Sequence, residues 1–134
     1  MIRSLPVIAM LGLALSACAQ HQPPQVRGAA FYAKYCTSCH GTSAQGDGPI
    51  AASFRVPPAN LTLISERNGG VFPIEDVMAQ INGYEGRHQF GGMPEFQKDL
   101  NGPVVDYVAA SGEVIKTPKA LIDMASYLEN IQRD

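Results

Sequence analysis

The sequence predicts an all-α fold with three or more helices and one small β-hairpin. Three stripes of apolar residues at helical spacing lead to this prediction, and a Cys-x-x-Cys-His pentad follows the first stripe directly. The chain has 134 residues, which suits a single domain, and it contains no internal repeats.

The first predicted helix begins at Arg27 and runs into the pentad. The segment before it, residues 18–26, is polar and rich in proline, so it is predicted to be a flexible tether in which His21 is solvated. The folded domain is accordingly predicted to cover 27–134. The apolar face of this helix recurs at i, i+3, i+4 and i+7, through Gly28, Phe31, Tyr32 and Tyr35.

A central and a C-terminal helix are also predicted. The central one spans 73–82, with acidic residues in its first turn and Gly83 just past its end. In the last helix Thr117 is the expected N-cap and Pro118 the first helical residue. Their apolar stripes are Ile74, Val77, Met78 and Ile81, and then Leu121, Met124, Ala125, Leu128 and Ile131.

A β-hairpin is predicted at about 104–116, between these two helices. Residues 104–108 and 113–116 alternate in polarity, and Ser111-Gly112 supplies turn chemistry between them. The hairpin is either a docking surface for a partner or a flap over the site, and the sequence leaves both open.

The pentad Cys36-Thr37-Ser38-Cys39-His40 predicts covalent attachment of one haem c. The spacing puts the sulfurs of Cys36 and Cys39 about one helical turn apart, so both reach the vinyl groups along one haem edge. His40 is then the expected proximal iron ligand.

Two other interpretations of the pentad are weaker. A redox pair of the thioredoxin kind needs a βαβ pattern, and the surrounding sequence has none. A structural zinc site needs two further ligands, for which the chain offers only His21, His88 and Cys18.

The N-terminus predicts export. Arg3 precedes an apolar run from Leu5 to Leu15, which is too short to span a bilayer and is typical of a signal-peptide core. The tetrapeptide that ends in Cys18 resembles the lipobox of bacterial lipoproteins, so 1–17 is predicted to be removed and Cys18 lipidated. The alternative is ordinary cleavage near Ala17 or Ala19.

A lipidated Cys18 accounts for the odd number of cysteines and gives stable anchoring, because it carries more than one acyl chain. Ala19 resembles the residue found after the cysteine in lipoproteins sorted to the outer membrane. The predicted location is therefore the periplasmic side of a bacterial membrane, with the outer membrane favoured. Nucleic acid is excluded as a partner, since nine basic residues face twelve acidic ones after loss of Arg3.

These residues together resemble a class I c-type cytochrome with one haem. Gly28 lies eight positions before Cys36 and Tyr32 lies four before it, which matches the glycine and aromatic positions of that family. The resemblance covers 27–131 and implies the cytochrome c fold, with the first and last helices crossing at the glycine. On the last helix the matching face consists of Met124, Tyr127 and Leu128.

Met93 is predicted to be the sixth iron ligand. It lies in an irregular segment in which glycines permit close approach and Pro94 stiffens the chain, and this segment resembles the Met-Pro ligand segment of the family. Met78 and Met124 lie on apolar helix faces, where methionine is usually core filler. The remaining alternatives are His88 and an open site; a thioether raises the potential, whereas a second histidine lowers it.

Further haem contacts follow from the resemblance. Pro49 ends a glycine-rich loop, and in similar cytochromes a carbonyl at this proline accepts the histidine proton, so Pro49 is expected to accept from His40. The alternative is that 46–49 is simply a turn. Asn60 either bonds a propionate or has an ordinary turn role. Other propionate candidates are Arg55, Tyr84 and Arg87. The predicted pocket lining is Phe54, Leu61, Phe72, Ile81, Phe90 and Phe96.

The resemblance implies a periplasmic electron carrier, because two filled axial positions leave no coordination site for substrate. Its partners would be redox donors and acceptors that dock transiently around the haem edge. Two alternatives remain: a cytochrome subunit of a periplasmic dehydrogenase or terminal oxidase, and a ligand-binding haem sensor or peroxidase-like protein.

Overall fold

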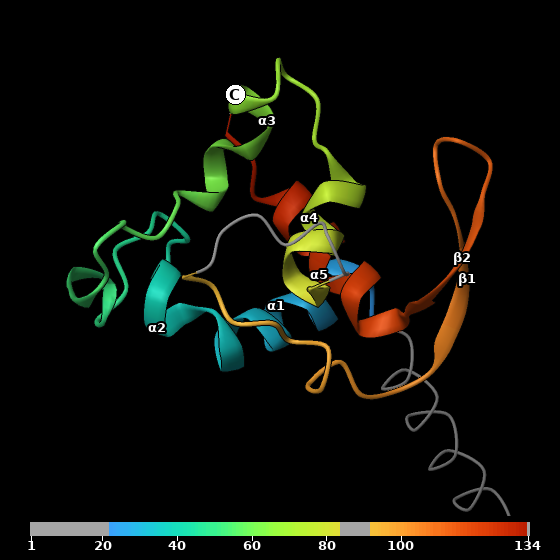
Figure 1. The fold of residues 1–134 in the computed structure, drawn as a ribbon, viewed down its shortest axis with the longest axis horizontal. Coiled ribbons are helices and arrows are strands. Elements are labelled where there is room, and N and C mark those ends of the chain that lie inside the picture. Colours follow the sequence, from blue (N-terminus) through green and yellow to red (C-terminus); the bar gives the residue numbers. More distant parts are fainter. Residues whose placement is uncertain (1–21, 84–91, 134) are drawn as a thin grey trace, which may run out of the picture.

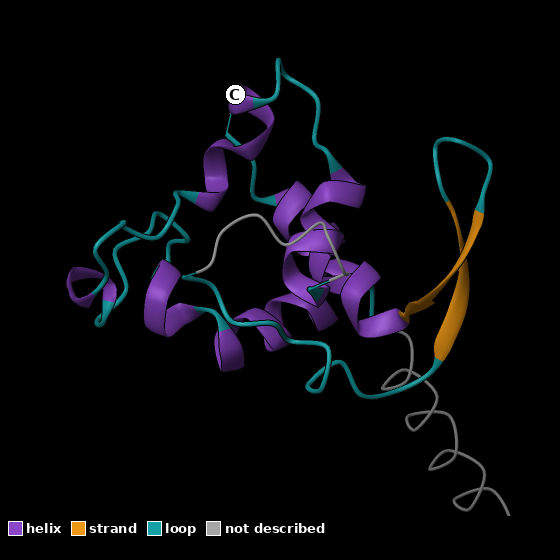
Figure 2. Ribbon diagram, in the orientation of Figure 1, coloured by secondary structure: helices purple, strands orange, loops and turns teal. Residues whose placement is uncertain are grey.

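A computed structural model describes residues 22–83 and 92–133, and it places a helical body beside one projecting hairpin (Figures 1 and 2). The predicted helices and the predicted hairpin are all present. In chain order the elements are α1 (Pro24–Tyr35), α2 (Thr37–His40), the 3-10 turns η2 (Ala51–Ser53) and η3 (Leu61–Leu63), α3 (Ile64–Arg67), α4 (Ile74–Asn82), β1 (Val104–Val108), β2 (Val114–Pro118) and α5 (Lys119–Asn130).

The first and last long helices, α1 and α5, pack against each other in the middle of this body (Figure 1). Their closest approach is at Gly28, which is buried. A Cβ atom there would lie 2.1 Å from the carbonyl oxygen of Asp123 and 2.7 Å from the Cβ of Tyr127. Only glycine permits this contact, so the predicted role of Gly28 is confirmed.

The core lies between α1, α4 and α5. Tyr32 is 2% exposed, and its ring centroid lies 5.3 Å from that of Tyr127, so the predicted aromatic position is part of the helix contact. Met78 and Met124 are both buried in this core, as expected of filler side chains.

Three predicted helix boundaries were wrong. The central helix was expected to begin at Pro73, but Pro73 is the N-cap and α4 begins at Ile74. The tether was expected to reach residue 26, but α1 begins at Pro24, because a proline at the first helical position has no N–H to lose. Thr117 was expected to cap α5, but it pairs with Val105 in the hairpin and its hydroxyl donates to the carbonyl of Ile115. The cap position therefore falls on Pro118, and α5 begins one residue later than predicted.

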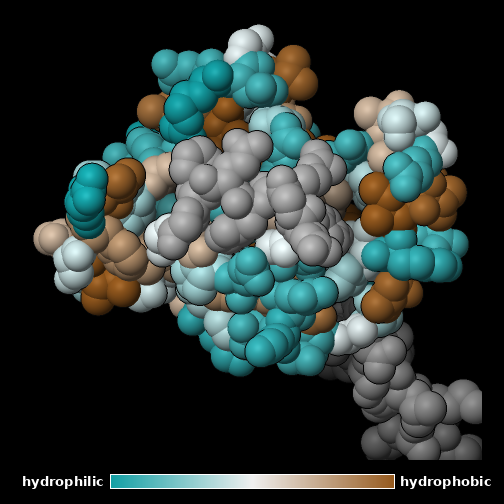
Figure 3. Space-filling model, viewed as in Figure 1, coloured by the Kyte–Doolittle hydropathy of each residue, from teal (hydrophilic) through white to brown (hydrophobic). Residues whose placement is uncertain are grey.

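The hairpin is antiparallel, with Val108 opposite Val114 and Val104 opposite Pro118. Its turn is fixed to the start of α4, since the amide of Ala110 donates to the carboxylate of Glu75 at 2.7 Å. The outward face carries Val104, Val108 and Val114, each more than half exposed, and Figure 3 shows apolar surface over this hairpin. Within the described ranges, no helix is long and apolar enough to cross a membrane.

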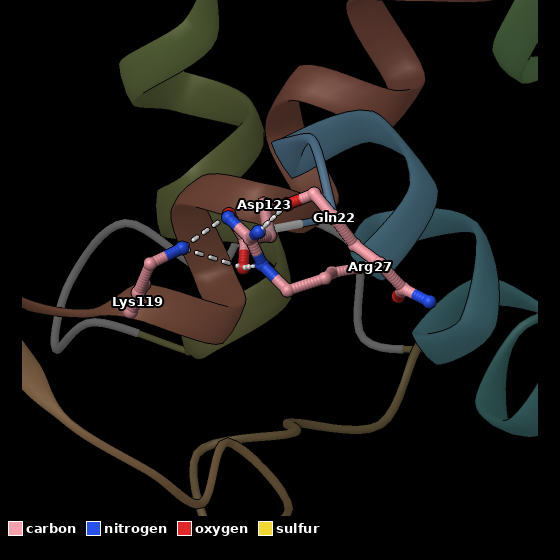
Figure 4. Close-up of polar contacts among 4 residues, drawn as sticks. All are labelled: Gln22, Arg27, Lys119 and Asp123. Carbon is pink, nitrogen blue, oxygen red and sulfur yellow. Dashed lines mark hydrogen bonds and ion pairs between the residues drawn. The ribbon is translucent and has the colours of Figure 1, made fainter. Parts of the chain in front are cut away.

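A charged triad closes one side of the contact between α1 and α5 (Figure 4). Asp123, with its side chain 7% exposed, accepts from Arg27 at 2.6 and 2.7 Å and from Lys119 at 2.9 and 3.0 Å. Arg27 also donates to the carbonyl of Gln22. Burial raises the pKa of Asp123, but the hydrogen bonds from Arg27 and Lys119 outweigh burial and hold that pKa below its ordinary value.

Replacing Gly28 with alanine is expected to destabilise the protein by about 1–3 kcal/mol, because the added methyl overlaps the backbone of α5. Chemical denaturation of the haem-loaded protein measures this loss. Gln25→Ala is the control, since Gln25 is exposed on the first turn of the same helix. Equal stability of Gly28→Ala and wild type would contradict the close crossing.

Asp123→Asn is expected to lower the free energy of unfolding by about 1–3 kcal/mol at neutral pH, since it weakens the charge-assisted hydrogen bonds from Arg27 and Lys119. A carboxyl with a lowered folded-state pKa stabilises above its unfolded pKa of 3.8, and that contribution is lost as the pH falls through the folded pKa. The difference between wild type and variant should therefore shrink in strong acid.

Urea denaturation at neutral and strongly acidic pH tests this dependence. The control is Asp106→Asn, which removes an exposed pair with Lys116 and should cost less than about 1 kcal/mol. A difference for Asp123→Asn that stays constant with pH would rule out the charged triad as its source.

Candidate haem site

The pentad consists of Cys36, which joins α1 to α2, and of the four residues of α2 itself. Cys36 is the residue at the junction: its amide donates to the carbonyl of Tyr32 at 2.9 Å, and its own carbonyl accepts from the amide of His40 at 2.9 Å. These hydrogen bonds keep Cys36 and Cys39 one turn apart, as the spacing predicts. The two cysteines are not joined in a disulfide, and Cys36 is the more buried of the two.

The thiol of Cys36 is unsuited to redox exchange. Burial, and secondarily the neighbouring Cys39, raises its pKa to about 12. Reactive cysteine pairs have the opposite property, because the thiolate is the attacking species. The thioredoxin-like interpretation therefore has neither the fold nor the acidity that it needs.

The zinc interpretation gains no support from the described residues. In 22–83 and 92–133, no three His, Cys, Asp or Glu side chains gather as metal ligands would. The three additional candidates considered for such a site, Cys18, His21 and His88, lie outside the described residues.

The imidazole of His40 is held in one tautomer. Its Nδ1 lies 2.9 Å from the carbonyl oxygen of Ala59, and because a carbonyl only accepts, Nδ1 carries the proton and donates. The other nitrogen, Nε2, is left with its lone pair. Burial lowers the pKa of His40 despite the opposing effect of this hydrogen bond, so the ring is neutral at physiological pH, as an iron ligand must be.

The prediction that the carbonyl of Pro49 accepts the proton of His40 was wrong, since the carbonyl of Ala59 does so. The loop that contains Pro49 caps the backbone of the pentad instead: the amide of Gly48 donates to the carbonyl of Cys39 at 3.0 Å, and that of Ile50 donates to Ser38 at 3.1 Å. Pro49 itself is exposed. Gly48 is required for this close packing, since a Cβ there would lie 2.3 Å from the carbonyl oxygen of Ser38.

The carbonyl of Ala59 is positioned by its neighbours on both sides. Before it, Gly46 packs so tightly that a Cβ there would lie 2.2 Å from the carbonyl oxygen of Pro58. After it, the amide of Leu61 donates to the carbonyl of Ala44 at 2.7 Å. The chain 44–61 thus closes into a loop that presents Ala59 to the imidazole.

Asn60 has the turn role that was one of its two predicted alternatives. Its Oδ1 accepts from the amide of Thr62 at 2.9 Å and from the hydroxyl of Thr62 at 2.7 Å, which caps η3. The propionate contact of Asn60 stays a prediction, and its NH₂ group is the part of the side chain that would make it.

Met93 lies beside α4 and is half buried against the core. The carboxamide of Gln80 donates to its sulfur, with Nε2 and Sδ 3.9 Å apart. The segment is fixed just after Met93, where the amide of Phe96 donates to the carbonyl of Ile81 at 3.0 Å. Gly83, in the left-handed region with φ 76°, leaves room for the side chain of Glu95 at this point.

The remaining predicted contacts are partly described. Arg55 is exposed on the loop after η2. Phe96 packs edge-on against Tyr35 and Phe31, with ring centroids 6.1 and 6.5 Å apart. Ile81 belongs to the core, and Leu61 and Phe72 pack against this core. Phe54 is half buried. The predicted residues outside the described ranges are Cys18, Tyr84, Arg87, His88 and Phe90.

Three functional contacts were missed at the sequence level. Ala59 acts through its backbone, so no side-chain signal marks it. Gln80 is a polar residue of α4, between the apolar residues Met78 and Ile81. A polar side chain at such a position indicates only weakly that it needs a hydrogen-bond partner, which here is Met93. Tyr32 was found as an aromatic core residue, but its buried hydroxyl also donates to the carbonyl of Gly41 at 2.6 Å, directly after His40.

These donors fit a c-type haem: two thiols one turn apart, a neutral imidazole with Nδ1 satisfied, and a half-buried thioether. The comparisons with known proteins agree. A family model described as cytochrome c oxidase, cbb3-type, subunit III matches residues 23–110, which include the pentad, α4, Met93 and β1. No curated protein and no solved structure matches the chain significantly.

Proposed function

Because the chain belongs to the c-type cytochrome family described as cytochrome c oxidase, cbb3-type, subunit III, we propose that it is a lipid-anchored carrier of single electrons in the periplasm. The family implies covalently bound haem c, and the small domain suits one haem. The observation that carries the proposal is the pentad helix with the His40 ring fixed by Ala59.

The protein supplies the environment, and haem c supplies an iron atom that accepts and releases one electron. His40 offers the lone pair of Nε2, and its hydrogen bond to Ala59 makes that nitrogen a stronger donor, which favours the oxidised state. Met93 offers a thioether, which favours the reduced state. The hydrogen bond from Gln80 orients the sulfur and draws electron density from it.

His40 and Met93 would both hold the haem iron, and with both bound the iron would have no position left for a substrate, so its chemistry would be the transfer of electrons. Apolar side chains around the site keep water from the iron. The thioether edge near Cys36 and Cys39 is the proposed point of contact with donors and acceptors, which bind transiently over a small area.

A second candidate is a permanent subunit of a larger oxidase. The description of the matching family names an oxidase subunit, and the three exposed valines of the hairpin offer apolar surface that a permanent partner would cover. Purification in mild detergent separates the two cases: a carrier elutes alone, whereas a subunit elutes with further haem or copper proteins.

Met93→Ala is expected to abolish the far-red charge-transfer band that methionine gives ferric haem, and to lower the reduction potential. Optical spectroscopy and potentiometric titration of the loaded protein measure both. Met78→Leu is the control, because Met78 is buried core and leucine has a similar volume. An unchanged spectrum and potential in Met93→Ala would exclude Met93 as ligand and leave His88 or an open site.

Cys18→Ser is expected to abolish lipid attachment, because serine cannot receive the thioether-linked lipid. Cell fractionation and metabolic labelling with a radioactive fatty acid measure the change. Wild type should carry label and sediment with membranes until detergent is added. A wild-type protein without label, or a Cys18→Ser protein that still carries label, would contradict the lipid anchor.

A further inference from the structure

The end of the chain is tied to the segment that orients His40. Figure 1 shows the C-terminal end beside α3, far in sequence from the residues it meets. The amide of Arg133 donates to the carbonyl of Thr62 at 2.9 Å. The side chain of Gln132 makes the remaining contacts, and these reach residues 61 and 65.

Both ends of the Gln132 carboxamide are used. Its Oε1 accepts from the amide of Ser65 at 2.9 Å, and its Nε2 donates to the carbonyls of Leu61 at 2.8 Å and Leu128 at 2.7 Å. All three partners are backbone groups with a fixed donor or acceptor role, so the orientation of the carboxamide is determined. Position 132 therefore requires a short side chain that accepts one hydrogen bond and donates two, which the carboxamide of glutamine provides.

The segment from Ala59 to Ser65 has little structure of its own. It contains the three-residue turn η3 and the start of the four-residue helix α3, which satisfy few backbone groups internally. Its position therefore depends on contacts with other parts of the chain. On one side Leu61 is held by Ala44, and on the other side it is held by Gln132.

We propose that Gln132 is a positioning residue for the proximal histidine, because it holds Leu61 and thereby the carbonyl of Ala59 that accepts the Nδ1 proton of His40. This inference rests on the proposed role of His40 as an iron ligand. Loss of Gln132 lets the 59–65 segment move away, which weakens the hydrogen bond to His40. A more weakly bonded imidazole is a poorer donor, so the oxidised state is less stabilised and the reduction potential rises.

The sign of the expected change in reduction potential distinguishes the role of Gln132 from that of Met93. Loss of Met93 lowers the potential, whereas loss of Gln132 raises it, so the two contacts are distinguished by sign. Gln132→Met is the informative variant, since it keeps the length of the side chain, adds no charge and removes both hydrogen-bonding ends. Gln132→Asn keeps the carboxamide but shortens the reach, and should give a smaller rise in potential.

The test is potentiometric titration of the loaded full chain, together with solvent exchange of the His40 Nδ1 proton followed by NMR. Gln132→Met should raise the potential and accelerate proton exchange. Gln25→Met, on the exposed first turn of α1, controls for the substitution itself. Tyr107→Ala controls for instability, because it removes a half-buried ring of the hairpin that packs against the core. Tyr107 lies outside both the α1–α5 crossing and the 59–65 segment, so this variant should leave the potential unchanged.

A Gln132→Met protein with the potential and proton exchange of wild type would overturn the inference. So would a Gln132→Met shift no larger than that of Tyr107→Ala, since such a shift would reflect a general loss of stability. If Gln132→Met does not fold, the same readouts on Gln132→Asn decide. The optical spectrum of wild type tests His40 ligation separately, so failure of that role is visible before any Gln132 variant is measured.

Discussion

The close approach of α1 and α5 at Gly28 is the constraint on which the rest of the structure depends. The carbonyl of Asp123 occupies the space that any side chain at position 28 would need. Because α1 leads directly into Cys36, this contact places the start of the haem-attachment turn. Because α5 ends at Asn130, it also places Gln132 against the 59–65 segment. One tight backbone contact therefore fixes both ends of the chain relative to the site.

The site itself is assembled from pieces that are anchored separately. The pentad helix is capped by the loop through Gly48, and the imidazole of His40 is held by Ala59 from the chain beyond. Met93 is held against α4 by two hydrogen bonds: Phe96 donates to the carbonyl of Ile81 at the end of α4, and Gln80 donates to the sulfur of Met93. If His40 and Met93 bind the iron as proposed, these hydrogen bonds would act on the two ligands in opposite senses, one strengthening the imidazole donor and the other weakening the thioether donor. The balance between them is a means of setting the potential without changing the ligands.

Features with a local chemical cause could be predicted from the sequence. The helical stripes, the glycine after α4 and the pentad each follow from spacing and residue type, and the hairpin follows from alternation. The role of Gly28 in the helix crossing came from the family resemblance. The role given to Pro49 failed for a different reason. Which carbonyl meets an imidazole depends on the three-dimensional path of a loop, and the loop through Pro49 is used to cap the pentad backbone. Thr117 failed likewise, because strand pairing with Val105 overrode its preference for a cap. Gln132 lies 67 positions from Ser65, and no local pattern reveals such a contact.

The central claim is that His40 and Met93 close both axial positions of a single haem c. Near-infrared magnetic circular dichroism of the oxidised wild-type protein tests this most directly, because the energy of the charge-transfer band distinguishes a thioether from a second imidazole and from an open position. The account predicts one low-spin species with the band of histidine and methionine ligation. A band of bis-histidine ligation, or a high-spin spectrum at neutral pH, would contradict it.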